Sequence, residues 1–119
     1  MKSRLAMLAA LPLLAAAAPP PHPDLVPVAV VGSGTTITVR VRNQGNAAAP
    51  AALLRVVIGA PINIAKNVPE PALLPGEVKS VIIPVGKPLA GVHFSVRVDG
   101  TNTIVESNES NNVASAIGH

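Results

Sequence analysis

Two stretches decide the fold: TTITVRVRN at residues 35–43 and GVHFSVRVD at residues 91–99. In both, apolar side chains stand at every second position, with polar side chains between them. This alternation is typical of β-strands that bury one face and expose the other to solvent. The two stretches therefore predict half-buried strands, and the side chains expected to point outward are Thr36, Thr38, Arg40, Arg42, His93, Ser95, Arg97 and Asp99.

Other segments are rich in β-branched residues and bounded by Gly, Pro and Asn, which is typical of short strands. These predicted strands are Asp24–Val31, Ala51–Ile58, Glu77–Val85 and Val113–Ile117. Pro27 predicts that the first is an edge strand or carries a break, because proline cannot donate to a neighbouring strand. The second is apolar on both faces except at Arg55 and is therefore expected to be central. Segment 59–75 holds four prolines, so we expect it to be irregular apart from a short edge pairing at residues 62–64.

No segment shows a helical period, so the apolar strand faces must cover one another. The economical arrangement is an all-β sandwich of about six to seven strands in two sheets packed face to face. The side chains expected to form the shared core are Ile37, Val39, Val41, Leu54, Val56, Val81, Ile83, Phe94, Val96 and Val98.

The first residues resemble an export signal. Residues 1–17 combine the basic Lys2 and Arg4, a short apolar run and small residues, which is the pattern of a secretory signal peptide cleaved after Ala17. The apolar run is shorter than the roughly 20 residues that a membrane-spanning helix needs. An uncleaved membrane anchor is the alternative. Residues 18–23 are expected to be a stiff Pro-rich linker with a solvated His22, and residues 24–119 the domain.

Composition excludes several functional classes. The chain has no Cys and one aromatic residue, so it offers neither thiolate chemistry nor a platform for stacking sugars or bases. Of nine Lys and Arg, two lie in the predicted leader, so the mature chain would have seven cations against six anions, or +1. Such a balance does not support nucleic-acid binding. The three histidines are scattered and no catalytic motif is present, so we expect no enzyme activity.

Several motifs resemble the CARDB family, the "cell adhesion related domain found in bacteria". They are PDLV at residues 23–26, TVRVRNQGNA at 38–47, LLPGE at 73–77 and, most specifically, VDGTNTIVESNESNN at 98–112. The resemblance covers residues 23–117. It implies an immunoglobulin-like β-sandwich in a secreted or surface protein of bacteria. The chain holds one copy of the domain, although such domains often occur as repeats.

The loop that follows Val98 gathers oxygen-bearing side chains and is a candidate calcium site. Calcium takes six to eight hard oxygen ligands, and the loop is rich in carboxylates and amides, although its spacing is not that of an EF-hand. The alternative is turn chemistry, in which these side chains accept hydrogen bonds from backbone amides. The candidate ligands are Asp99, Asn102, Glu106, Asn108 and Glu109, and no other cofactor is expected.

The outward arginines are a candidate partner-binding patch. Arg40 and Arg42 share one strand face, and Arg55 and Arg97 could lie near them. The alternative is a solvated sheet face whose charges prevent aggregation. Together these features predict an exported, non-catalytic module for protein interaction or adhesion in the cell envelope or outside the cell, through an exposed sheet face or edge strand. A calcium-dependent binding module is the second hypothesis, and an exported inhibitor or chaperone-like protein that caps a partner's strand is the third.

Overall fold

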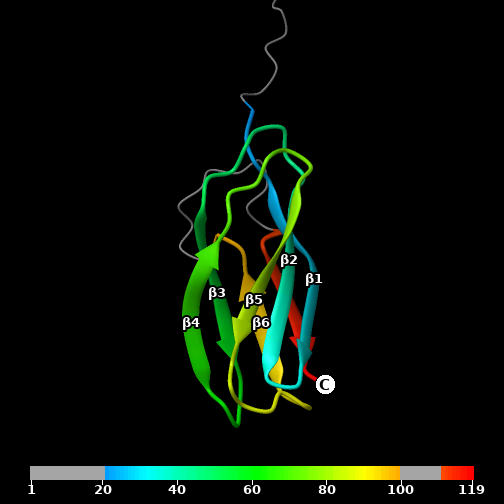
Figure 1. Cartoon of the computed structure of the whole chain (residues 1–119), viewed down its shortest axis with the longest axis vertical. Coiled ribbons are helices and arrows are strands. Elements are labelled where there is room, and N and C mark those ends of the chain that lie inside the picture. The colour runs from blue at the N-terminus through cyan, green and yellow to red at the C-terminus, as the bar shows by residue number, and fades with distance from the viewer. Residues whose placement is uncertain (1–20, 100–110) are drawn as a thin grey trace, which may run out of the picture.

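The computed structural model describes residues 21–99 and 111–119, and within them the chain forms seven β-strands and no α-helix (Figure 1). The strands are β1 (Leu25–Ser33), β2 (Thr36–Asn43), β3 (Ala52–Ile58), β4 (Ile64–Glu70), β5 (Val78–Pro84), β6 (His93–Arg97) and β7 (Val113–Ile117). In this described part, no helix is long and apolar enough to cross a membrane.

The strands form two antiparallel sheets that pack face to face. One sheet has the order β1-β2-β5 and the other β4-β3-β6-β7, so β2, β3 and β6 are central. The predicted central position of β3 is confirmed. So is the prediction for Pro27, because β1 is an edge strand whose register shifts between Pro27 and Ala29. The architecture is the predicted immunoglobulin-like sandwich.

The space between the sheets is filled by the predicted apolar side chains. All ten predicted core residues are buried, and most of them are completely inaccessible to solvent. Additional buried residues come from the strand ends and loops: Leu25, Ala49, Ile58, Leu73, Leu89 and Val92. The one aromatic side chain of the protein, Phe94, belongs to this core and is only 3% exposed.

The prediction for residues 59–75 was wrong, because the segment contains a full strand. β4 pairs with β3 along seven positions, from Ala52–Glu70 to Ile58–Ile64. The apolar alternation was hidden because Lys66 occupies an inward-facing position of this edge strand. Its ammonium reaches the other sheet and donates a 3.2 Å hydrogen bond to the carbonyl of Pro84 in β5. Pro69 is tolerated because β4 has a neighbour on one side only.

Asp99 was also predicted wrongly, since it does not continue the outward series of His93, Ser95 and Arg97. The strand ends at Arg97, and Asp99 takes a left-handed backbone conformation with φ 48°. Its side chain is completely buried. The alternation therefore stops where the chain leaves the sheet, and the polar character of Asp99 does not indicate exposure.

Candidate functional site

The family motifs converge at one end of the sandwich, which we call the polar pole. It lies where β1 begins, β2 ends and the connection 71–77 passes, at the top of Figure 1. Most of its polar side chains are shielded from solvent, although they sit far apart in sequence. The polar pole comprises Asp24, Asn43, Gln44, Glu70, Asp99, Asn111 and Asn112.

Asn43 organises the polar pole from the last position of β2, where its side chain is completely buried. Its Oδ1 accepts hydrogen bonds of 3.0 Å from the backbone N–H groups of Asp24 and Gly45. Its Nδ2 donates to the carbonyls of Ala47, at 2.8 Å, and Leu73, at 3.3 Å. One amide side chain thus satisfies backbone groups of three different segments, each of which carries one of the family motifs.

The start of the domain is held against the turn that follows β2. The Asp24 carboxylate accepts 3.0 Å hydrogen bonds from the side-chain amides of Gln44 and Asn111. The backbone of His22, two residues before the predicted domain boundary, exchanges hydrogen bonds with Asn46. His22, predicted to be solvated, is half-buried.

Residue 45, in the turn after β2, has to be glycine because the first residues of the domain pack against it. A Cβ at this position would meet backbone atoms of His22, Pro23 and Asp24, and it would lie only 2.6 Å from the Asp24 nitrogen. Backbone atoms at that distance cannot give way cheaply, so only glycine lets the two segments touch. The glycine of the NQG sequence is therefore explained by close packing of the first residues of the domain.

The LLPGE sequence forms the predicted tight turn beside Asn43. The Glu77 N–H donates to the Leu74 carbonyl, with Pro75 and Gly76 at the two central positions. Gly76 has φ 81°, which is typical of a type II turn. The Glu77 carboxylate accepts from the Leu74 N–H at 2.8 Å and lies 3.6 Å from the Lys79 ammonium. The motif is thus explained by turn geometry.

Only one of the predicted calcium ligands lies among the described residues. Asp99 is buried at the polar pole, and its N–H donates a 2.9 Å hydrogen bond to Oε1 of the buried Glu70. The other predicted ligands, Asn102, Glu106, Asn108 and Glu109, lie outside the described residues. Across residues 21–99 and 111–119, no three His, Cys, Asp or Glu side chains are grouped closely enough to hold a metal ion.

Sequence reasoning missed Glu70. It lies at the end of the strand that the prolines concealed, and it is only 1% exposed. A signal was present in the alternation of Ile64, Lys66, Val68 and Glu70, which places Glu70 on the inward side once β4 is recognised. Asn43, by contrast, was within a quoted motif, but its role depends on the chain segments that it joins.

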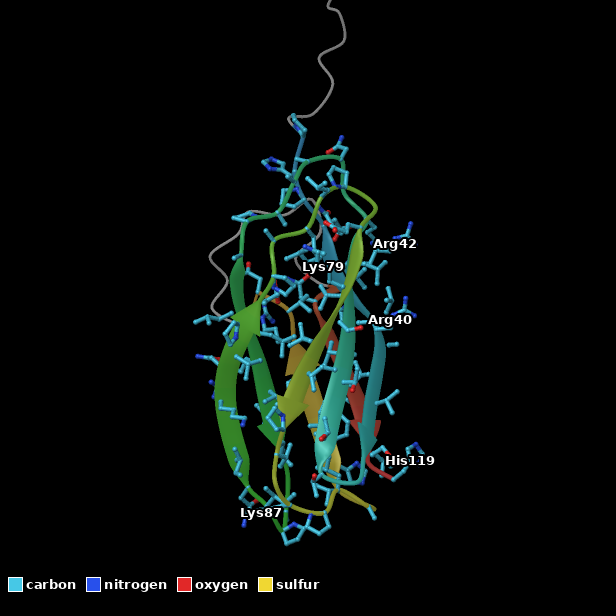
Figure 2. All side chains as sticks on the ribbon, viewed as in Figure 1. Arg40, Arg42, Lys79, Lys87 and His119 are labelled. Atoms are coloured by element: carbon cyan, nitrogen blue, oxygen red, sulfur yellow. The ribbon has the colours of Figure 1, made fainter. Side chains whose placement is uncertain are left out.

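The four arginines do not form one patch. Arg40 and Arg42 project from the outer face of the three-stranded sheet (Figure 2), where they occupy successive outward positions of β2. Arg55 and Arg97 belong to the other sheet, where they are directly opposite each other on β3 and β6. Because the two sheets pack through their inner faces, the two arginine pairs lie on opposite sides of the molecule.

Comparison with known proteins identifies the class to which this fold and these motifs belong. The CARDB family model matches residues 22–116, and the chain therefore belongs to the CARDB family. No curated protein sequence matches it.

The solved structures that resemble the chain include the following two. A crystal structure of the CARDB domain of a Pyrococcus furiosus protein, in complex with di-metal ions, is 29% identical, with a TM-score of 0.61 over 82% of this chain and 94% of that one. A solution structure of a domain from a candidate cell surface protein of Methanosarcina acetivorans is 27% identical, with a TM-score of 0.66 over 81% and 90% of the two chains.

Proposed function

We propose that the protein is an exported, non-catalytic CARDB module that takes part in protein interaction or adhesion in the cell envelope or outside the cell. The observation that carries this proposal is family membership, together with the likeness to a domain of a candidate cell surface protein. The predicted signal peptide at residues 1–17 supports export. The explanation of the motifs by backbone hydrogen bonds and close packing supports a structural role for them.

Export is tested by expressing the full chain with a C-terminal tag in a bacterium and fractionating the cells. We expect a processed product that begins at Ala18 in the envelope or extracellular fraction. The matched variant Leu13→Arg, which interrupts the apolar run, should leave the chain unprocessed. An unprocessed wild-type chain confined to the cytoplasmic fraction would contradict the proposal.

A calcium-dependent binding module is the second candidate. It is favoured by the di-metal ions bound to the similar Pyrococcus furiosus domain and by the buried carboxylates of Glu70 and Asp99 at the polar pole. The remaining ligands would come from Asn102, Glu106, Asn108 and Glu109. A metal that binds only the folded state raises the midpoint of thermal unfolding. The midpoint should therefore rise with millimolar calcium and return with chelator, whereas an unchanged midpoint would exclude this candidate.

A further inference from the structure

The outer face of the four-stranded sheet has an unusual charge distribution. Along β3, β4, β6 and β7, its outward positions carry Arg55, Arg97 and His93, and otherwise only neutral side chains. No carboxylate points outward from these described strands. Several large apolar side chains are exposed on the same face: Leu53 (38%), Val57 (43%), Val113 (53%) and Ile117 (51%). We call this surface the β3–β6 face.

Arg55 and Arg97 are cross-strand neighbours, and this arrangement costs stability. Directly opposed side chains on adjacent strands have Cβ atoms about 5 Å apart, and like charges at such positions repel. Arg55 donates a 3.5 Å hydrogen bond to Oδ1 of Asn67. Within the described part of the chain, neither arginine forms an ion pair, since the one ion pair there joins Lys79 and Glu77. An anion placed between the two guanidinium groups would relieve the repulsion.

A shallow hollow of about 430 Å³ adjoins the arginine pair on this face. Its floor is formed by the small side chains of Ser95 and Ser115, which are directly opposite each other on β6 and β7. Val57 and Ile117 border it with exposed apolar surface, and His93 lies at its far end. The hollow therefore offers an apolar rim and polar hydroxyls one pair of residues away from Arg55 and Arg97, which have no ion-pair partner among residues 21–99 and 111–119.

We propose that the β3–β6 face binds an extended segment of a partner protein in which a carboxylate side chain and an aliphatic one stand two residues apart and therefore point to the same side. The carboxylate lies between Arg55 and Arg97, and the aliphatic side chain occupies the hollow beside Ser95 and Ser115. A polypeptide fits better than a carbohydrate, because the only aromatic side chain, Phe94, is buried and offers no stacking surface. Two arginines are too few for a nucleic acid, which requires a sustained basic surface.

The other sheet supplies a matched control. Arg40 and Arg42 carry the same charge as Arg55 and Arg97, but they lie on one strand rather than opposite each other. Their cross-strand neighbours are Ala29 and Ser80 for Arg40, and Val26 and Val78 for Arg42. Substituting Arg40 thus changes net charge equally while leaving the β3–β6 face intact.

The test is an NMR titration of the purified protein with the end-blocked peptide Gly-Val-Ser-Glu-Ser-Val-Gly, in which Glu and Val are two residues apart, and, separately, with its Gln analogue. We expect the Glu peptide to shift the amide signals of Ser95 and Ser115 but not that of Ser80 on the opposite face. Binding should weaken with salt, because the Debye screening length falls from about 10 Å at 0.1 M salt to about 3 Å at 1 M. Arg55→Gln should reduce affinity about threefold to tenfold, and Arg40→Gln should not.

Arg97→Glu separates binding from folding. It replaces a repulsive cross-strand pair with an attractive one, so the midpoint of thermal unfolding should rise by about 2–6 °C while peptide binding is lost. Loss of binding in a more stable protein cannot be attributed to unfolding. Equal binding of the Gln peptide, equal loss with Arg40→Gln, or no binding at all would overturn the proposal. Binding of polygalacturonate in place of the peptide would overturn it as well, in favour of an anionic carbohydrate.

This inference rests on the proposed function in one respect: it assigns the face through which the proposed protein interaction takes place. The titration uses purified protein and does not depend on export. If the peptide fails to bind while the chain is still exported and processed, the assigned face is wrong and the proposed function stands. If the chain is not exported, the proposed function fails, whatever the titration shows.

Discussion

The buried side chain of Asn43 satisfies two N–H groups and two carbonyls of the backbone at the polar pole. Only an amide combines an acceptor and a two-proton donor in this shape, and neither Asp nor Leu can replace it without leaving buried backbone groups unsatisfied. Asn43 thereby joins the start of β1, the turn after β2 and the connection that precedes β5.

We expect Asn43→Ala to lower the free energy of unfolding by about 3 kcal/mol, because buried polar groups without a partner cost about 1–3 kcal/mol each. Chemical denaturation of the purified protein measures this loss. The matched control is Asn67→Ala on the exposed side of β4, which should change stability by less than about 0.5 kcal/mol. Similar effects of the two substitutions would show that the hydrogen bonds of Asn43 add little.

The failures of sequence reasoning at single residues have a common cause. Asp99 and Glu70 are acidic, and acidic residues are usually exposed. Asp99 was therefore predicted to point outward, and Glu70 was not recognised as buried. The Glu70 carboxylate is bonded by the backbone N–H of Asp99, a residue whose backbone takes a left-handed conformation. The pairing depends on a tertiary contact between residues 29 positions apart, which no local pattern encodes.

Among the strands with strict alternation, β2 was predicted to within one residue, whereas β6 is two residues shorter at each end than predicted. β2 and β6 have clear apolar and polar faces, and β7, although its outward side is also mostly apolar, has the bounds predicted for it. β4 was missed because Lys66 and two prolines, at 69 and 71, interrupt the pattern that sequence reasoning requires. The segment forms a strand because it pairs with β3 and because Lys66 bonds the Pro84 carbonyl in β5. Both are tertiary contacts, which a local pattern does not show.

The segment after β7 closes the end of the sandwich opposite the polar pole. Gly118 accepts from the Gly91 N–H and donates to the Val92 carbonyl, while His119 accepts from Gly34 and donates to Gly32. Gly118 has to be glycine, because a Cβ there would collide with the backbone of Leu89. These bonds join the last residues to the β1–β2 turn and to the start of β6.

Deleting Gly118 and His119 should therefore loosen that end selectively. Hydrogen exchange followed by NMR should show faster exchange at the amides of Gly34 and Gly91, whose acceptors are removed. The Asn43 amide, bonded to the Glu77 carbonyl at the polar pole, serves as the internal control. Uniform acceleration at both ends would instead mean that the last two residues support the entire domain.

The two-layer architecture followed from the sequence, but the placement of charges around it did not. Alternation shows that Arg40, Arg55 and Arg97 point away from the core, and this was correct. It cannot show which sheet a strand joins, since sheet membership depends on strand order. The expected single patch is consequently two pairs on opposite faces, and only the pair with a neighbouring hollow suggests a binding surface.

His22 is bonded to Asn46 at the polar pole, whereas His119 is held at the opposite end of the sandwich (Figure 2). A stretching force applied between these residues acts along β1 and β7, so it must slide each strand past β2 or β6 and break many hydrogen bonds together. Tension applied between Gly34 and His119, which are adjacent, opens contacts one after another. In single-molecule pulling the first geometry should withstand the larger force, and equal rupture forces would contradict this mechanical anisotropy.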